Sequence, residues 1–202
     1  MLHTRDNQSE RDGDRDDSAD TVLLARINNG DREAFRELYG KYYHPLLRFI
    51  YRMSGNLELA QEGINDVMLV VWQNGQSFAG RSKVATWIMG IAYRKALKLI
   101  EKSRRWTDRI SATNFDAWNE PSTDQIEHTQ STEIEDLLEH GMRKLSAKQR
   151  AVVELTYHYG YSYEEIATIA GCPVNTVKTR MFHARAKLRE ALPLLAKDEL
   201  QL

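Results

Sequence analysis

The segment CPVNTVKTRMFHARAKL, residues 172–188, carries five basic side chains on a stretch whose apolar residues have helical spacing. Val177, Met181 and Leu188 belong to one apolar stripe, and the polar and basic residues lie opposite it. Basic groups bind phosphates, and polar side chains near the start of such a helix can hydrogen-bond base edges in the major groove. The segment therefore indicates binding to duplex DNA, although an ordinary amphipathic helix with a solvated basic face has the same pattern.

Two predicted helices precede this segment and would position it. Ser162 and Glu165 have the spacing of a capping box, which predicts a helix over SYEEIATIAG that ends at Gly171. Ser146 and Gln149 form a second capping box at the start of the helix before it. A short helix, a glycine-containing turn and a second helix make a helix-turn-helix motif, whose second helix enters the major groove.

A second basic block lies upstream, in a helix predicted over VATWIMGIAYRKALKLIEKSRRW. Its basic side chains share one flank, aromatic residues are interleaved with them, and the polar loop QNGQSFAGRSK comes before. Cations beside aromatic rings suit single-stranded DNA, because the cations bind phosphates while the rings stack with bases. Helical periodicity also fits Trp87 to the core, so both roles stay open for this residue.

Charge is strongly segregated along the 202 residues, although the formal net charge is only −1. Residues 1–20 carry 3 basic and 7 acidic side chains, and residues 21–109 carry 15 and 8. Residues 110–140 carry 8 acidic side chains and no Lys or Arg, whereas residues 141–202 carry 10 basic and 6 acidic ones. Two basic blocks separated by an acidic one predict two polyanion-binding domains joined by a solvated linker.

Only helical periodicity is found, so we expect an all-α fold of two small helical domains joined by a flexible acidic linker. Asp20, Asp31 and Asn56 are the predicted N-caps of the first three helices. The predicted organisation is a disordered acidic tail over 1–20, a first domain over 21–109, the linker over 110–140, a second domain over 141–196 and a tail over 197–202.

Composition argues against several classes of function. The longest apolar run, VMLVVW, is too short to cross a bilayer, and the N-terminus lacks the apolar core of a signal peptide. We therefore expect a cytoplasmic protein without membrane insertion. The single cysteine, Cys172, permits no intrachain disulfide and is interpreted as a small buried filler rather than a redox sensor. Without a Gly-rich nucleotide loop, a metal-spaced His cluster or a nucleophile–base set, we expect no cofactor, no metal and no enzymatic activity.

The stretch LSAKQRAVVELTYHYGYSYEEIATIAGCPVNTVKTRMFHARAKLREAL resembles region 4 of the extracytoplasmic-function sigma factors, a group within the sigma-70 family. Region 4 of that family reads the promoter −35 element, although response-regulator output domains look similar. By this resemblance, Arg180 and Arg185 take backbone-facing or packing positions. The −35-binding residues that it implies are Lys178, Thr179, Arg180, Phe182, His183 and Arg185.

Three upstream segments are similar to region 2 of the same family and occur in the family's order: DREAFRELYGKYYHPLLRFIYRM, AQEGINDVMLVVW and FAGRSKVATWIMGIAYRKALKLIEKSRR. The resemblance implies that the second segment docks on the clamp helices of the largest RNA polymerase subunit, and that the third captures the melting −10 element. The implied core-binding residues are Gln61, Glu62, Asn65, Asp66 and Leu69. The implied −10-binding residues are Arg81, Lys83, Trp87, Arg94, Lys95, Lys98 and Lys102.

Taken together, the resemblance implies an alternative sigma factor that binds core RNA polymerase and directs transcription initiation at promoter DNA. It also implies an anti-sigma factor as a partner, and it leaves the chemistry of RNA synthesis to the polymerase. The alternative is a helix-turn-helix transcriptional regulator that binds DNA without acting as a sigma subunit. Transcription with purified core enzyme distinguishes the two.

Overall fold

The computed structural model describes the backbone of residues 6–113, 138 and 140–191 and the side chains of residues 17–103, 138 and 140–190. Within these ranges every regular element is helical, which confirms the all-α expectation. Residues 114–137 and 139 of the linker predicted over 110–140 lie outside the described residues, as do residues 192–196 of the predicted second domain and the predicted tail at 197–202. The helix that begins at Val84 continues to Thr113, four residues into the predicted linker. The elements are α1 (Asp6–Asn28), α2 (Arg32–Ser54), α3 (Leu57–Asn74), the short 3₁₀ helix η1 (Gly75–Ser77), α4 (Val84–Thr113), α6 (Ala147–Tyr157), α7 (Tyr163–Ala170) and α8 (Val174–Ala191).

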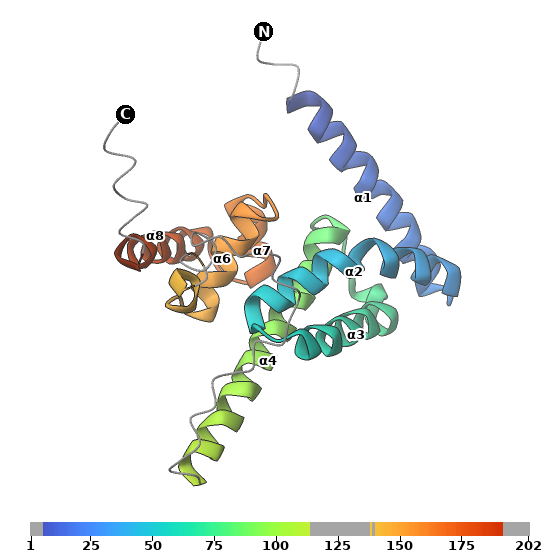
Figure 1. The fold of residues 1–202 in the computed structure, drawn as a ribbon. Helices are drawn as coiled ribbons and strands as arrows, with labels where there is room; N and C mark the ends of the chain where they lie inside the picture. Colours follow the sequence, from blue (N-terminus) through green and yellow to red (C-terminus); the bar gives the residue numbers. More distant parts are fainter. Residues whose placement is uncertain (1–5, 114–137, 139, 192–202) are drawn as a thin grey trace, which may run out of the picture.

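Helices α1 to α4 pack around one apolar core, and the second half of α4 extends beyond it (Figure 1). Leu38, Phe49 and Ile64 are fully buried there. Gly63 lies in the middle of α3, where a glycine costs on the order of 1 kcal/mol relative to alanine. A Cβ at this position would lie only 3.1 Å from side-chain atoms of Ile50 and Leu99. The glycine therefore lets α3 approach its neighbours closely.

Two of the predicted N-caps are confirmed. The Asp31 carboxylate accepts hydrogen bonds from the backbone N–H groups of Glu33 and Ala34, and the Asn56 side chain accepts one from Leu59. The Ala34 bond and the nearby Arg26 side chain hold the pKa of Asp31 below its usual value. Both caps satisfy donors that the first turn of a helix leaves without an intrahelical partner.

The predicted cap at Asp20 and the predicted disorder of the N-terminal tail differ from the structure. Helix α1 begins at Asp6, so Asp20 lies inside the helix rather than at its start. Its side chain is buried, with 1% of the residue exposed. Lys41 Nζ lies 2.6 Å from the carboxylate, and the Tyr42 hydroxyl donates to its other oxygen. The acidic composition of residues 1–20 alone predicts a disordered tail. The contacts with Lys41 and Tyr42 of α2 instead hold Asp20 in the folded domain.

The start of α4 receives a cap from far along the chain. Asp17 Oδ1 accepts a 2.8 Å hydrogen bond from the backbone N–H of Val84, the first residue of α4. A carboxylate at a helix N-terminus satisfies an orphan donor and interacts favourably with the helix dipole. Helix α1 therefore contributes directly to the position of α4.

Helices α6, α7 and α8 form the second domain. Both predicted capping boxes are present, at Ser146 with Gln149 and at Ser162 with Glu165. Helix α7 ends at Ala170, and its C-cap Gly171 has a φ of 61°, in the left-handed region that favours glycine. The turn from α7 to α8 thus has the local chemistry that the sequence predicts. Among the described helices, none has the length and apolar character to cross a bilayer.

The two domains are in contact, and Tyr159 contributes to the contact from the loop after α6. Its hydroxyl donates a 2.8 Å hydrogen bond to the backbone carbonyl of Pro45 in α2. Burial raises the pKa of Tyr159 to about 12, and burial raises the pKa of Tyr161 to about 12 as well. Both phenols are therefore neutral in the folded chain at pH values where exposed tyrosines ionise.

Stability is expected to fall as the pH rises from about 10 towards about 12. An unfolded tyrosine ionises near pH 10, whereas Tyr159 and Tyr161 keep their protons until about pH 12. Their contribution is complete below pH 10 and is lost as the pH rises through the folded pKa, because ionisation then favours the unfolded chain. Tyr159→Phe should reduce the loss, as measured by urea unfolding between pH 9 and 11. If the unfolding free energy of Tyr159→Phe falls with rising pH as steeply as that of the native chain, Tyr159 is not a source of this pH dependence.

Candidate nucleic-acid interface

Helix α8 presents the polar and basic face that the sequence predicts. Its apolar stripe is buried against α6 and α7, with Val177 and Met181 almost fully enclosed. The opposite face is open, and five of the six implied −35 residues lie on it: Lys178, Thr179, Phe182, His183 and Arg185. Phe182 is 69% exposed, although apolar side chains of its size are normally buried. The exposed ring thus offers an apolar contact on an otherwise polar helix face.

Two of the implied −35 cations have partners within the chain. Arg185 Nη2 donates a 2.8 Å hydrogen bond to the Tyr157 hydroxyl, and this bond raises the pKa of Arg185. Arg180 is half-buried, and its Nη1 lies 3.5 Å from Cys172 Sγ. Arg180 also lies beside the Tyr93 phenol of α4, where its positive charge opposes the rise in pKa that burial gives Tyr93. Arg180 therefore points towards the first domain rather than into the open face.

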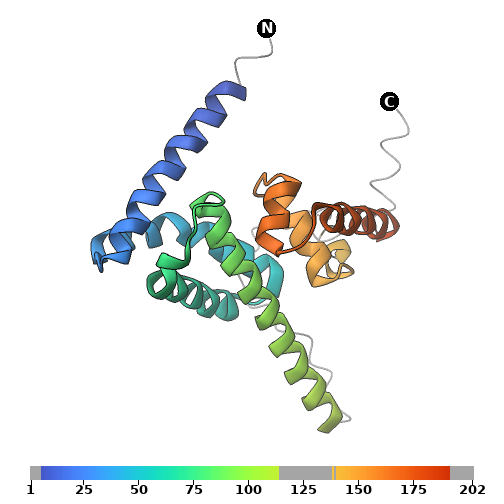
Figure 2. The same ribbon diagram turned by 180° about the vertical axis from the view of Figure 1, so that it is seen from behind.

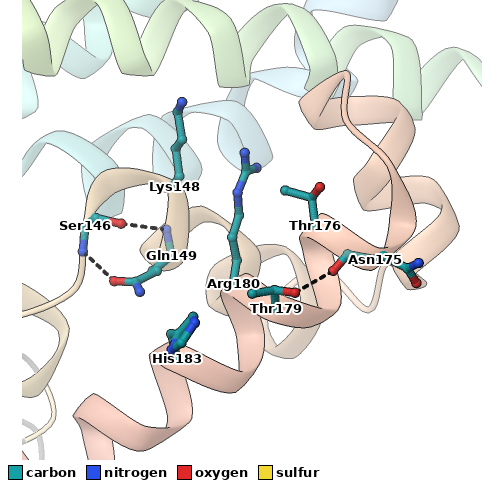
Figure 3. Close-up of a pocket in the computed structure, with 8 residues that line it drawn as sticks. All are labelled: Ser146, Lys148, Gln149, Asn175, Thr176, Thr179, Arg180 and His183. Atoms are coloured by element: carbon teal, nitrogen blue, oxygen red, sulfur yellow. Dashed lines mark hydrogen bonds between the residues drawn. The ribbon is translucent and has the colours of Figure 1, made fainter.

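A hollow of about 400 Å³, lined by residues with polar side chains, lies between α8 and the start of α6 (Figure 3). Thr179 donates its hydroxyl hydrogen to the backbone carbonyl of Asn175 at 2.9 Å, so its oxygen can still accept a hydrogen bond from a ligand. Five lining residues were not among the implied site residues, although the capping box marks where α6 begins. The lining consists of Ser146, Lys148, Gln149, Asn175, Thr176, Thr179, Arg180 and His183.

Helix α4 and the loop before it carry the implied −10 residues. Arg94, Lys98 and Lys102 are exposed and recur every four residues along one flank, about 6 Å apart along the axis. Arg81 and Lys83 are exposed in the loop. Such a row of cations can follow the phosphates of a DNA strand.

Trp87 is only half-buried, which fits neither a pure core role nor a fully open one. Its ring lies 5.6 Å from the ring of Phe78, at an interplanar angle of 57°. Phe78 comes from the loop, so the pair joins the loop to the first turn of α4. The remaining exposed part of the indole is available for stacking beside the cations of this helix.

Among the implied −10 residues, Lys95 is the one for which the described part of the chain shows an acidic partner. Its Nζ lies 3.0 Å from Asp66 Oδ2 on α3, and both side chains are partly exposed. Helical periodicity assigns Lys95 to the same basic block as Lys98, but it does not reveal a partner on another helix. The ion pair thus joins one implied −10 residue to one implied core-binding residue.

The outer face of α3 carries the remaining implied core-binding residues. Gln61, Glu62, Asn65 and Leu69 are exposed, and Leu69 is 50% accessible. Asn65 accepts a 3.2 Å hydrogen bond from the hydroxyl of Tyr39 on α2. An exposed apolar side chain on the same helix face as polar ones is compatible with a protein interface, which combines apolar and polar contacts.

The sequence interpretation missed a row of aromatic rings beside this face. Tyr39 stacks with Tyr43 at 5.8 Å and lies 6.1 Å from Phe35, whose ring meets Trp72 of α3 edge-on at 5.2 Å. The spacing of Phe35, Tyr39 and Tyr43 by four residues is the signal that could have shown a shared helix face.

Comparisons with known proteins agree for both domains. The family models for Sigma-70 region 2 and Sigma-70, region 4 match residues 38–107 and 135–188. RNA polymerase sigma-H factor of Pseudomonas aeruginosa is 32% identical over 184 residues, covering 87% of this chain and 95% of that protein. The ECF RNA polymerase sigma-E factor of Escherichia coli K12 is 30% identical over 177 residues, covering 82% of this chain and 90% of that protein. The chain belongs to the sigma-70 family, within its extracytoplasmic-function group. It is therefore an alternative sigma factor for transcription initiation.

Two solved structures have the same fold as this sigma factor. The sigma factor RpoE from Bartonella quintana, solved with the anti-sigma factor NepR, has 24% identity and a TM-score of 0.61 over 79% of this chain and 96% of that one. CnrH, solved with the cytosolic domain of CnrY, has 21% identity and a TM-score of 0.62 over 87% and 98%. In this sigma factor, the region 2 match begins within α2, so α1 lies before the matched segment.

Proposed function

We propose that this sigma factor binds core RNA polymerase and selects promoters through two separate DNA contacts. The domain over 21–109 would hold core polymerase and melted −10 DNA, and the domain over 141–196 would hold the −35 duplex. The acidic segment over 110–140 would join them inside the polymerase. The observation that carries the proposal is the open face of α8, where exposed polar, basic and aromatic side chains border a hollow lined by polar residues.

On the −35 side, Lys178 and Thr179 lie near the start of α8 and would reach base edges. Helix N-terminal residues are the ones that approach bases when a recognition helix enters the major groove. Phe182 and His183 follow one turn later on the same exposed face and would extend the contact. Arg185 would bind a phosphate beside the site, since it lies at the edge of this face.

On the −10 side, the cation row of α4 would follow the strand while Trp87 stacks with a base. Arg81 and Lys83 would add phosphate contacts from the loop. Lys95 would contribute once its pairing with Asp66 is exchanged for DNA. The outer face of α3, which carries the exposed Leu69, would contact the polymerase.

The remaining partners and the cellular setting follow from the family. RpoE and CnrH were each solved with a partner, in the first case a named anti-sigma factor, and we infer that an anti-sigma factor sequesters this chain as well. The chain would have no catalytic activity of its own, because the polymerase performs the chemistry. Its place of action would be the cytoplasm, where polymerase and chromosomal DNA meet.

Transcription with purified core enzyme tests the proposal. The full chain is mixed with core polymerase and a pool of genomic promoter fragments, and run-off transcripts are sequenced. Transcripts from a set of fragments with shared −35 and −10 sequences are the expected result. Specific DNA binding without any core-dependent transcript would instead identify a helix-turn-helix regulator that does not act as a sigma subunit.

Removing the cation row should flatten the salt dependence of binding to fork-junction DNA. Each phosphate contact on a single strand contributes a slope of about 0.7 in log K against log salt, so replacing Arg94, Lys98 and Lys102 by Ala should reduce the slope by about 2. Fluorescence anisotropy of the holoenzyme at several salt concentrations measures it. The double variant Arg32→Ala with Arg36→Ala, at exposed positions of α2, is a control that removes two cations outside the implied DNA-binding residues. An unchanged slope of log K against log salt would show that the three residues do not contact the DNA phosphates.

A further inference from the structure

Helix α1 supports both ends of the loop that carries two of the implied −10 residues. This loop, residues 78–83, runs from the end of η1 to the start of α4 and contains Arg81 and Lys83. In both ribbon views α1 passes close to η1 and to the start of α4 (Figures 1 and 2). The region 2 match begins at residue 38, so the support comes from a helix that precedes the matched segment.

At the α4 end of the loop, the support is a hydrogen bond from backbone to side chain. The Val84 N–H donates to Asp17 Oδ1 at 2.8 Å. Val84 is fully buried and Asp17 is half-buried, so water competes poorly for this donor. The Trp87 N–H donates to the Lys83 carbonyl at 3.1 Å and closes the first turn of α4. Asp17 therefore caps the residue that directly follows the loop, and it fixes where the loop ends.

At the η1 end of the loop, the support is a close approach of two segments. A Cβ built on Gly75 would lie 2.3 Å from Asn28 Oδ1 and 3.2 Å from Leu24 Cδ1. Leu24 is buried, and Asn28 Oδ1 is a buried atom without a hydrogen-bond partner among the described residues. The absence of a side chain at Gly75 thus lets η1 lie directly against α1. The Phe78 N–H donates to the Gly75 carbonyl at 3.1 Å, which ties the start of the loop to this contact.

Between its two ends, the loop holds its cations through the backbone. Arg81 and Lys83 are exposed, and neither side chain has a hydrogen bond or an ion pair among the described residues. The ring of Phe78 lies 5.6 Å from the ring of Trp87, which joins the start of the loop to the first turn of α4. The positions of the two cations therefore depend on how the ends of the loop are held.

Helix α1 is itself anchored to the domain by contacts that do not involve the loop. Asp20 lies three residues after Asp17, on the same side of the helix, and its carboxylate is 2.6 Å from Lys41 Nζ of α2. Leu23 and Ile27 are 6% and 2% exposed, so the following turns of α1 are packed into the core. A cap provided by α1 is therefore held in place by the rest of the domain.

We propose that Asp17 is a positioning residue for the −10 contact, because its cap on α4 holds the loop in the arrangement from which Arg81 and Lys83 reach DNA. The inference rests on the proposed function for the DNA contact and on the hydrogen bond alone for the cap. Asp17 acts through the loop rather than on the DNA. Losing the cap lets the loop take other arrangements, which weakens binding of the −10 strand and leaves the −35 contact as it was.

Two substitutions at position 17 separate the cap from the charge. Asp17→Asn removes the negative charge but keeps an oxygen that can accept from the Val84 N–H, whereas Asp17→Ala removes both. Holoenzyme is titrated against fork-junction DNA that carries the −10 sequence shared by the transcribed fragments, and against the same DNA with that sequence scrambled. Asp17→Ala should bind the first DNA about fivefold more weakly, the population shift that corresponds to one helix cap. Asp17→Asn should bind it as the native chain does, and neither variant should change the affinity for the −35 duplex.

Hydrogen exchange of the full chain without polymerase tests the cap independently of DNA. The Val84 amide lies in the first turn of α4 and has no partner within the helix, so its protection reports the bond to Asp17. Two-dimensional NMR should show a protected Val84 amide in the native chain and in Asp17→Asn, and fast exchange in Asp17→Ala. Fast exchange in the native chain would overturn the cap.

The η1 end of the loop is tested by a change of size and its compensation. Gly75→Ala places a methyl group where Asn28 Oδ1 lies, so it should displace η1 and weaken −10 binding in the same titration. Adding Asn28→Ala removes the obstructing oxygen and should restore the binding. Native −10 affinity in Gly75→Ala would show that this end of the loop does not contribute.

The remaining outcomes separate the inference from the proposed function. Equal losses on −10 and −35 DNA in Asp17→Ala would assign Asp17 to general stability and overturn the positioning role. Equal losses in Asp17→Ala and Asp17→Asn would overturn the cap as the cause. Native −10 affinity in Asp17→Ala, with the Val84 protection lost, would overturn the positioning role and leave the proposed function intact. If the native holoenzyme binds the shared and scrambled −10 sequences alike, the proposed −10 contact fails, while hydrogen exchange still decides the cap.

Discussion

Asp20→Ala is expected to lower the free energy of unfolding by about 3 kcal/mol, the cost typical of removing one partner of a buried ion pair. The carboxylate is almost fully enclosed between α1 and α2, where it accepts from the Lys41 ammonium and the Tyr42 hydroxyl. Alanine would take away both bonds and leave a small void at a site that water reaches poorly. The effect should be large for a residue in the chain's acidic N-terminal segment.

Urea unfolding followed by circular dichroism measures this change, with Ser18→Ala as the matched control. Ser18 lies two residues before Asp20 in the same helix but is exposed, so its replacement should change stability by no more than about 0.5 kcal/mol. Tyr42→Phe removes one hydroxyl, and its effect should not add to that of Asp20→Ala because the two groups share a bond. If Asp20→Ala unfolds like the native chain, α1 does not dock on α2.

The same residue shows where sequence reasoning stops. Asp31, Asn56, Ser146 and Ser162 could be identified as caps because each partner lies two or three residues away, and local spacing is visible in a sequence. The partners of Asp20 lie 21 and 22 residues away. The acidic residues next to Asp20 in the sequence therefore predict a disordered tail, whereas in the folded chain Asp20 is bound by Lys41 and Tyr42.

Distance along the chain also explains the capping of α4. The acceptor at Asp17 and the donor at Val84 are separated by 67 residues, so no local pattern joins them. The start of α4 could nevertheless be predicted at Val84, because helical periodicity begins there. Periodicity locates an element, whereas long-range side-chain contacts hold its end in place.

The candidate DNA-binding faces could be predicted for the same reason, but the ion pair of Lys95 could not. Periodicity correctly places Lys178, Phe182 and Lys98 on solvent-facing flanks. Lys95 has an equally suitable position in the sequence, yet it turns towards Asp66 on another helix. The packing position that the resemblance allows for Arg180 agrees with its half-buried place beside Cys172. A helical wheel states which side of a helix a residue occupies, and it carries no information on what packs beside that side.

Phe182→Ala should weaken binding to the specific −35 duplex by about 1–3 kcal/mol, and Lys178→Ala should do the same. An exposed phenyl ring can contact a thymine methyl group in the major groove, and a lysine can bind the O6 and N7 acceptors of guanine. Because Phe182 is 69% exposed, its loss removes little packing, and the thermal midpoint of the protein should stay unchanged.

Holoenzyme binding to duplexes that differ at single −35 positions distinguishes base reading from phosphate binding. If the two residues read bases, each variant should lose discrimination at particular positions and bind the altered duplexes as the native chain does. Arg189→Ala, in the last turn of α8, serves as the control, since Arg189 lies more than one and a half turns after His183 along the helix. An equal loss on every duplex would assign Lys178 to phosphate binding. For Phe182, which carries no charge, an equal loss would place the ring against the sugar–phosphate wall of the groove.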